Sequence, residues 1–202
     1  MATFDLARKS RPVVITEYQA RWPGEFEMMA QRIRSLVGTA AALRIDHIGS
    51  TAVPGLAAKD VIDVQVTVPN LNDTGALTQP LWAAGFRQGA EFQRDEFRGK
   101  AADDPELRKL YLREPEGERR VHIHVREQGR FNQRYALLFR DYLRAAPPVR
   151  REYELLKRRA AQVFPDSIDG YLFLKDPVFH LIYEGAELWA QAVGWAPDDQ
   201  GL

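Results

Sequence analysis

Two histidines are spaced so that they could share one site. His122 and His124 lie in the strand-like stretch RVHIHVRE, where both side chains point to the face opposite the apolar residues Val121, Ile123 and Val125. Two imidazoles on one face can bind phosphate or a transition metal, or transfer a proton. A half-exposed sheet face accounts for a His-x-His pair equally well, because histidine serves both surface and core.

A carboxylate in a second strand could join them. Asp63 lies in DVIDVQVTV, residues 60–68, and an aspartate inside a strand must be solvated, paired or bound to a metal. Gln65 shares its face, at the position where a second acid would help to hold Mg²⁺ against a triphosphate. Asp63 alone therefore predicts a weak Mg²⁺ site, and a solvated aspartate is the alternative. His47 lies in the preceding strand and could meet His122 and His124 beside Asp63, which would give three histidines at one site.

The turn between these strands could bind phosphate. Gly49 lets the backbone approach a ligand closely, and the backbone N–H groups and the Ser50 hydroxyl can donate to phosphate oxygens. This is not a P-loop, because Gly55 is followed by Leu56 rather than by Lys and Ser or Thr. Tight turns also use glycine and serine for backbone reasons alone.

Cationic side chains follow in the C-terminal third. Arg140 and Arg144 lie four residues apart on one helical face, and Lys157 and Lys175 lie on later helices. Solvated ion pairs explain most such charges. If this face covers the sheet, the same cations would neutralise a triphosphate. The aromatic residues interleaved with them have helical spacing and are predicted to be core: Tyr135, Phe139, Tyr142 and Tyr153.

The elements that must position these residues follow from periodicity. Strands are predicted at 13–15, 43–50 and 60–68, and a hairpin at 107–113 and 120–126 around EPEGER. In the strand 60–68, one face carries Ile62, Val64, Val66 and Val68. Helices are predicted at 23–38 and 71–84, and beyond Gly129 the pattern is helical only, with a last helix capped by Asp176 and opened by Pro177.

This order of elements predicts an α+β fold, a mixed sheet with flanking helices and a C-terminal helical layer. The predicted parts are a core at 11–129 and a helical subdomain packed on it at 130–195. The chain has 28 Lys and Arg residues and 28 Asp and Glu residues, so its formal net charge is zero. This balance argues against a protein that coats nucleic acid or an anionic membrane. The absence of cysteine excludes disulfides and thiolate metal sites, and no run of 18 apolar residues occurs. We expect a cytoplasmic protein.

Several blocks in order match a known family. The matching pieces are Tyr18 and Trp22, HIGSTAVPGLAAK at 47–59, VIDV at 61–64, HIHV at 122–125, LFRDYLR at 138–144, EYELLK at 152–157 and Lys175. Over nearly the whole chain, the sequence resembles the GrpB-like proteins, a bacterial family placed in the nucleotidyltransferase superfamily. The resemblance implies a nucleotidyltransferase-like fold, with an NTP as substrate and Mg²⁺ or Mn²⁺ as cofactor.

Carried over by position, Gly49 and Ser50 would form the phosphate turn and Asp63 would be the first metal carboxylate. Gln65 lies where active superfamily members carry a second acid, and the two histidines lie in the strand where a third is expected. These departures put the usual two-metal route in doubt. Asp60 replaces a proline common in the family, and it points to the strand face opposite Asp63.

Three hypotheses remain open. The first is a metal-dependent nucleotidyltransferase acting on an unknown acceptor, with Asp63, His122 and His124 as catalytic residues. Its phosphate or nucleotide ligands would be Gly49, Ser50, Thr51, Lys59, Arg140 and Lys175. The second is a catalytically degenerate nucleotide- or phosphate-binding protein, and the third is an interaction module that uses its helical layer. Two or more carboxylates at the site would favour transfer, and a single one would favour binding alone. The partner expected is a small-molecule nucleotide, and the oligomeric state is left open.

Overall fold

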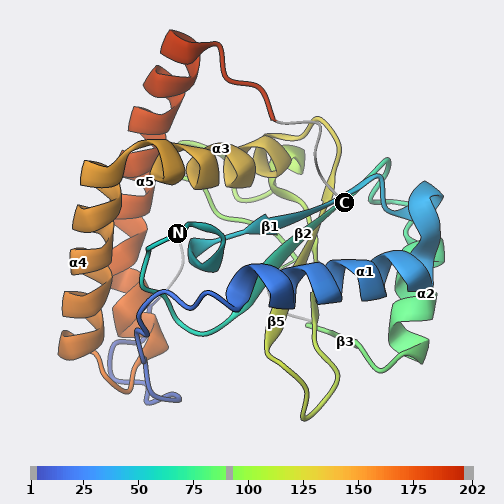
Figure 1. The fold of residues 1–202 in the computed structure, drawn as a ribbon, viewed down its shortest axis with the longest axis horizontal. Coiled ribbons are helices and arrows are strands. Elements are labelled where there is room, and N and C mark those ends of the chain that lie inside the picture. The colour runs from blue at the N-terminus through green and yellow to red at the C-terminus, as the bar shows by residue number, and fades with distance from the viewer. Residues whose placement is uncertain (1–3, 90–92, 198–202) are drawn as a thin grey trace.

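The computed structural model describes residues 4–89 and 93–197. A five-stranded sheet, in the order β1-β2-β5-β4-β3, lies at its centre (Figure 1). The strands are β1 (Arg44–Ile48), β2 (Ile62–Val68), β3 (Arg87–Gln88), β4 (Leu110–Arg113) and β5 (Val121–Glu127). The pair β2 and β5 is parallel and the other neighbours are antiparallel, which confirms the predicted mixed sheet and its hairpin.

One face of the sheet is apolar, as the period of two predicted. The residues Ile62, Val64, Val66 and Val68 of β2 are buried with Val121, Ile123 and Val125 of β5. Two helices cover this face, α1 (Trp22–Ala41) and α2 (Gly75–Ala83). Gly38, where helix α1 was predicted to end, has φ +74 and breaks the regular helix there.

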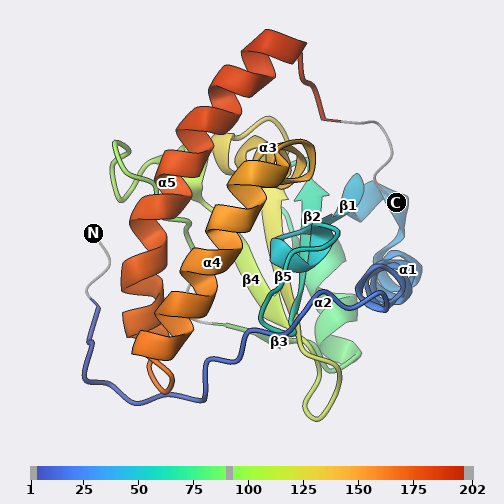
Figure 2. The same ribbon diagram turned by 60° about the vertical axis from the view of Figure 1, so that its left-hand side comes forward.

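A layer of helices covers the other face (Figure 2). It consists of α3 (Phe131–Ala145), α4 (Pro147–Val163) and α5 (Ile168–Val193), and it begins just after the positive-φ turn at Gly129. The aromatic residues predicted to be core form the second apolar cluster, with Tyr142 at its edge. The predicted C-terminal helical layer is therefore confirmed, whereas the division into 11–129 and 130–195 stays a prediction.

The N-terminal strand prediction at 13–15 was wrong. The backbone there forms only one isolated bridge, between Thr16 and Ala58, with two hydrogen bonds of 2.8 and 2.9 Å. Val13 donates its N–H to the carbonyl of Pro165 instead, and its side chain packs beside α4 and α5. A three-residue apolar run can pack without pairing in a ladder, so the apolar pattern alone misled the prediction.

The predicted start of the last helix was also wrong. Helix α5 begins at Ile168, where the Ser167 hydroxyl accepts a hydrogen bond of 3.1 Å from the N–H of Gly170. Pro177 lies inside this helix rather than at its first position. The helix tolerates the proline because only one intrahelical donor is lost, while packing against α3 and α4 supplies most of its stability.

Smaller differences affect the remaining elements. Helix α2 starts at Gly75 instead of residue 71, because the N–H of Leu71 donates to Glu127 Oε2 outside the helix. Strand β4 starts at Leu110, preceded by a short 3₁₀ turn, Pro105–Leu107. Within the described residues, no helix combines the length and the apolar character needed to cross a membrane.

Candidate functional site

The pairing of β2 with β5 brings the aspartate and both histidines together. Asp63 lies directly opposite His122 in the parallel register, and His124 is two residues further along the same face. The distance from Asp63 Oδ1 is 3.2 Å to His122 Nδ1 and 3.9 Å to His124 Nε2. The three side chains are 26%, 21% and 17% exposed, so the cluster stays open to small ligands.

The charge state of this cluster is set by its own contacts. Burial acts to raise the pKa of Asp63, but hydrogen bonds from His122 and His124 outweigh it and hold that pKa well below its usual range. Burial and the charge of Lys109 lower the pKa of His124 to about 4, against the opposing effect of Asp63. Asp63 is therefore a carboxylate and His124 a neutral imidazole at pH 7.

The turn before β2 lies against the carboxylate of Asp63. Gly49 has φ +72, and a Cβ atom built there would lie 2.4 Å from Asp63 Oδ2. Only glycine meets both the backbone and the space requirement at this position. The backbone at Gly49 thus lies close to the Asp63 carboxylate, and its approach to a phosphate ligand stays a prediction.

The next two residues of the turn have different surroundings. Ser50 is part-buried and interacts with Tyr153 of α4, so the turn is connected to the helical layer. Thr51 is buried, and its hydroxyl donates to the carbonyl of Val61 at 3.1 Å while lying 3.0 Å from His47 Nε2. The structure therefore brings Gly49 to Asp63 and Ser50 to Tyr153, but it directs the Thr51 hydroxyl into the core.

His47 does not join the other two histidines, contrary to expectation. It pairs with Val64, so its ring points to the apolar face of the sheet. There it stacks on Phe26, with ring centroids 4.7 Å apart and an angle of 7° between the planes. Its hydrogen bond to Thr51 satisfies Nε2 inside the core, which makes His47 a structural histidine.

Gln65, at the position of the missing second acid, is fully buried and committed elsewhere. Its amide donates to the carbonyl of Gln133 on α3 at 3.1 Å, and its Oε1 accepts from Arg126 at 2.7 Å. Asp60 likewise lies away from the cluster, where it accepts hydrogen bonds from Trp22 and Arg119. Among the described residues, Asp63 is the one carboxylate of the cluster that could hold a metal ion.

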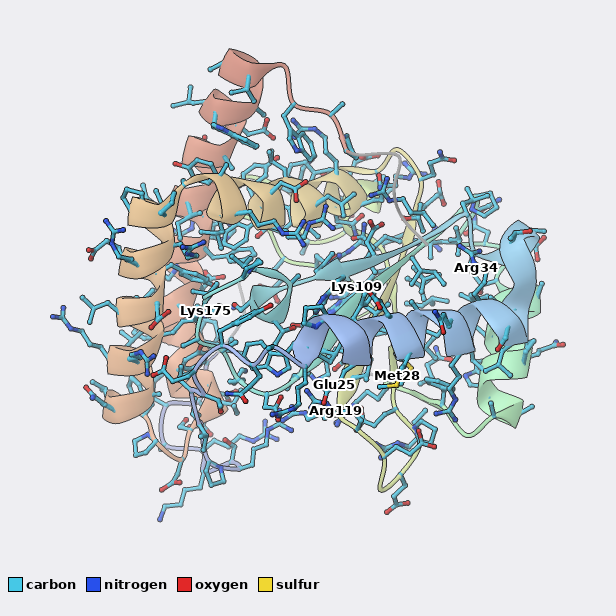
Figure 3. The ribbon with its side chains drawn as sticks, in the orientation of Figure 1. Glu25, Met28, Arg34, Lys109, Arg119 and Lys175 are labelled. Atoms are coloured by element: carbon cyan, nitrogen blue, oxygen red, sulfur yellow. The ribbon has the colours of Figure 1, made fainter. Side chains whose placement is uncertain are left out.

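Sequence reasoning missed a second polar cluster beside the first. Asp95 accepts from Lys109 at 2.6 Å, from Arg126 at 2.9 Å and from Asn132 at 3.1 Å. Lys109 also lies 3.3 Å from His124 Nδ1, over the middle of the sheet (Figure 3). Asp95 comes from a stretch without periodicity, so nothing in the local sequence signalled its position. The predicted strand positions of Lys109 and Arg126 could have suggested a nearby acid, because buried charges need partners.

The two arginines predicted to neutralise phosphate hold the turn region. Arg140 is buried, and it donates to the carbonyl of His47 at 3.1 Å and to Asp141 at 2.7 Å. Arg144 donates to the carbonyl of Ala52 at 2.8 and 3.0 Å. These bonds tie α3 to both sides of the Gly49–Ser50 turn, so the condition that the arginine face covers the sheet is met, whereas neutralisation of a triphosphate by these arginines stays a prediction.

Three lysines from separate segments converge on the same side of the molecule. Lys59 comes from the loop before β2, Lys157 from α4 and Lys175 from α5, which projects toward the sheet (Figure 3). Burial and the charge of Lys175 lower the pKa of Lys59 to about 8, while Asp63 opposes the shift. Burial and Lys175 also lower the pKa of Lys157, whose side chain is 1% exposed and whose Nζ donates to the carbonyl of Ala57.

Aromatic rings, not carboxylates, contact these three ammonium groups. The rings of Tyr171, Tyr153 and Phe179 lie 5.0, 5.0 and 5.2 Å from Lys59, Lys157 and Lys175 respectively. None of the three lysines forms an ion pair with a carboxylate of residues 4–89 or 93–197. The charge of Lys175 lowers the pKa of both Lys59 and Lys157, so the three lysines form a concentration of positive charge that has no ion-paired carboxylate within the described residues.

Comparison with known proteins places this geometry in a family. The sequence pattern of the family described as GrpB protein matches residues 12–185. A protein named dephospho-CoA kinase from Mycolicibacterium paratuberculosis is 36% identical, over an alignment that covers 98% of this chain and 51% of that protein. The chain thus spans about half the length of this curated relative.

Two solved structures agree with the fold. The crystal structure of conserved protein GrpB from Enterococcus faecalis has a TM-score of 0.72 and 33% identity, and the match covers 87% of this chain and 99% of that one. A Cid1 poly(U) polymerase structure with bound MgGTP has a TM-score of 0.50 and 13% identity, and covers 79% of this chain and 50% of that one. This second likeness shows the fold alone.

The resemblance expected from the sequence blocks is confirmed by the match over residues 12–185 and by the shared architecture of sheet and helices. The chain belongs to the GrpB family, and its fold is that of the nucleotidyltransferases.

Proposed function

We propose that this chain binds a nucleoside triphosphate, with the phosphates between the Gly49–Ser50 turn and the lysines at 59, 157 and 175. The observation that carries the proposal is the convergence of three ammonium groups that lack a carboxylate partner among the described residues. Removing a cation from water without an anion costs several kcal/mol, so such a group favours binding of a polyanion. The fold supports a nucleotide as that polyanion, because the superfamily acts on NTPs.

Binding without transfer is the function that the geometry favours. The cluster contains a single carboxylate, Asp63, and the second acid position, Gln65, is buried and hydrogen-bonded to Gln133 and Arg126. Two divalent ions next to one carboxylate would repel each other without neutralisation. The catalytically degenerate nucleotide-binding protein is therefore our first candidate.

Nucleotidyl transfer to an unknown acceptor is the second candidate, favoured by one observation. His122 and His124 face Asp63 from the strand where a third acid is expected, so that part of the site keeps metal-binding or proton-transferring groups. In this reading Asp63 would hold Mg²⁺ or Mn²⁺, and a histidine would serve as the base or contact the leaving group.

The kinase activity in the name of the mycobacterial relative is not proposed for this chain. A phosphate loop of the P-loop type needs Gly-Lys followed by Ser or Thr, and the sequence contains no such tripeptide. The relative is about twice as long as the matched region, and the other half of that protein lies outside the comparison.

Calorimetric titration with a non-hydrolysable NTP, with and without Mn²⁺, tests the proposal. We expect Lys175→Met to weaken binding about 10- to 100-fold, because one charge-assisted contact to phosphate is lost. Lys100→Met is a matched control, since Lys100 also lies over a phenylalanine ring, that of Phe131, but pairs with Asp104. Equal affinities of the wild type and Lys175→Met would place the phosphate site elsewhere.

A turnover assay separates the two candidates. The protein is incubated with an α-labelled NTP, Mn²⁺ and a cell extract that supplies acceptors, and release of pyrophosphate and labelling of any acceptor are followed. Binding without pyrophosphate release above that of Asp63→Ala would support the binding function. Release that depends on Asp63 and His122 would support nucleotidyl transfer.

A further inference from the structure

The geometry points to a transition-metal site of the Zn²⁺ type at Asp63, His122 and His124, in place of the two-carboxylate Mg²⁺ site that the fold implies. This inference deepens the proposed function, because it names the metal chemistry of the same site. It rests on the three donor groups themselves and does not need the nucleotide.

The spacing of the donor atoms suits one small cation. One atom from each side chain can be chosen so that all three lie within 4.8 Å of one another, and two of the separations are 3.2 and 3.9 Å. Metal–ligand bonds of about 2.0–2.1 Å place neighbouring ligands about 2.9–3.4 Å apart. The separation of 3.9 Å must therefore close by about 0.5 Å, and the third separation, which lies within 4.8 Å, must also fall into this range when an ion binds.

The donor types decide which cation fits. Mg²⁺ takes oxygen ligands in a strict octahedron, whereas one carboxylate with two imidazoles is a set that Zn²⁺ and neighbouring first-row ions accept. The other acids on this face of the sheet are paired with cations. Asp46 pairs with Arg44 at 2.7 Å, and Asp95 pairs with Lys109 at 2.6 Å. The residues present thus do not fit a Mg²⁺ site that needs a second carboxylate.

The scaffold keeps the three donors on one side of the ion. Asp63 and His122 sit on directly paired positions of β2 and β5, at the centre of the sheet, so their separation is fixed by the strand register. Lys109 Nζ lies 3.3 Å from His124 Nδ1, and Nε2 of that ring faces Asp63. Because an ammonium group can only donate, metal binding at Nε2 requires the His124 proton to move to Nδ1 and Lys109 to move away from it. Three ligands on one side leave the remaining positions of the ion for water or a phosphate oxygen.

Cations beside the rings limit the strength of the site. Lys109 lies 3.3 Å from His124, and Arg120 lies 3.4 Å from His122 Nε2. Their positive charges oppose a bound dication. We therefore expect dissociation constants in the micromolar range rather than the much tighter binding of structural zinc sites.

Co²⁺ is the probe for the test, because its visible absorption reports both binding and ligand type. The full chain, treated with a chelator and then freed of it, is titrated with Co²⁺ in the absence of nucleotide, and Zn²⁺ or Mg²⁺ is then added in competition. We expect one Co²⁺ per chain, displacement by stoichiometric Zn²⁺ and no displacement by millimolar Mg²⁺. Displacement by Mg²⁺ as well, or no saturable Co²⁺ absorption, would overturn the inference.

Variants assign the ligands. Asp63→Asn and His124→Gln are each expected to lower the Co²⁺ affinity at least tenfold, while His180→Gln, which removes a histidine outside the cluster, leaves it unchanged. His122→Asp guards against loss of folding as the explanation, because it should shift the preference of the site toward Mg²⁺, a gain that an unfolded chain cannot show. Unchanged Co²⁺ spectra in Asp63→Asn would overturn the assignment.

The outcomes for metal and nucleotide are separable. If Co²⁺ binds as described but the NTP titration shows no binding, the metal site stands and the proposed function fails. If NTP binds through the lysines while no transition metal binds at the cluster, the proposed function stands and this inference fails.

Discussion

Gly49 shows how one residue couples the backbone to the site chemistry. Its φ of +72 belongs to a region that side chains disfavour, and the space above its Cα is filled by the Asp63 carboxylate. A side chain at this position would therefore have two effects: it would strain the turn, and it would displace the carboxylate of Asp63. The sequence motif is short, but its glycine is required by two independent conditions.

Replacing Gly49 with alanine should separate these two costs. We expect Gly49→Ala to lower the free energy of unfolding by about 3 kcal/mol, from backbone strain plus the contact with Asp63. Gly117→Ala is the matched control, since Gly117 has φ +79 but open space, and it should cost only about 1 kcal/mol. Urea unfolding of the three proteins measures the difference, and equal losses in both variants would mean that the contact with Asp63 is relieved without cost.

His47 gives the protein a pH dependence of stability. Burial lowers the pKa of His47 from 6.5 to about 4 in the folded state. Between these values the unfolded chain binds a proton that the folded chain does not, so stability falls as the pH drops through this window. From pH 7 to pH 5 the loss is about 2 kcal/mol.

The contribution of this one histidine can be isolated by comparison. Urea unfolding at pH 7 and pH 5 is measured for the wild type and for His47→Gln, which removes the titrating group but keeps a hydrogen-bonding side chain near Thr51. The wild type should lose about 2 kcal/mol more than the variant on acidification. An equal loss in both would show that other groups dominate the pH dependence.

At the scale of elements, the strands were predictable and some helix boundaries were not. Strand β2 has an unbroken period of two, so its apolar and polar faces could be assigned from sequence, and β5 could be assigned in the same way. The start of α5 could not, because Asp176-Pro177 carries the usual signal of a helix start inside a helix that Ser167 already caps. Local signals of equal strength competed, and packing against α3 and α4 decided between them.

Substitution of the two candidate caps tests this boundary. Ser167→Ala should lower the free energy of unfolding by about 1 kcal/mol, because the N–H of Gly170 loses its acceptor. Asp176→Ala should change it by less than about 0.5 kcal/mol, since this side chain is 42% exposed and its ion pairs within the described residues are those with Arg98 and His180. Thermal unfolding of both variants is the measurement, and a larger loss for Asp176→Ala would mean that the helix is divided at Pro177.

The candidate site, like the helix boundaries, could be predicted from the sequence only in part. Sequence pattern predicted that Asp63, His122 and His124 share a face, because strand period and parallel or antiparallel pairing leave few arrangements. It could not reveal that His47 belongs to the apolar face, since that depends on which residue of β1 lies opposite Val64. Nor could it place Asp95, whose loop has no period and whose partners Lys109 and Arg126 come from other segments.

At the scale of the whole molecule, helices cover both faces of the sheet. The interactions between sheet and helices differ in kind from one face to the other. Apolar contacts join it to α1 and α2, whereas hydrogen bonds of buried polar groups join it to α3, among them Gln65 with Gln133 and Arg140 with the carbonyl of His47. Neither layer can leave without exposing buried groups that have partners only in the assembled chain. We therefore expect the two predicted parts, 11–129 and 130–195, to unfold together.

Cooperative unfolding can be checked with two signals. Far-ultraviolet circular dichroism reports the helices, most of which lie in the C-terminal layer, and tryptophan fluorescence includes the fully buried Trp22 of α1. Urea titrations followed by both signals should give coincident midpoints. Two separated transitions would show that the helical layer and the core are independent folding units.

The direct pairing of Asp63 with His122 in parallel strands also limits how this protein can change in evolution. Deleting or inserting one residue upstream of His122 within β5 would turn both imidazoles into the apolar core and bring Val121 or Ile123 to the carboxylate. Changes of length within these two strands therefore destroy chemistry and packing at once, whereas point substitutions can exchange one ligand and leave the core intact. Relatives should diversify at this position by swapping donor types, and any gaps in their alignments should fall in the loops outside β2 and β5.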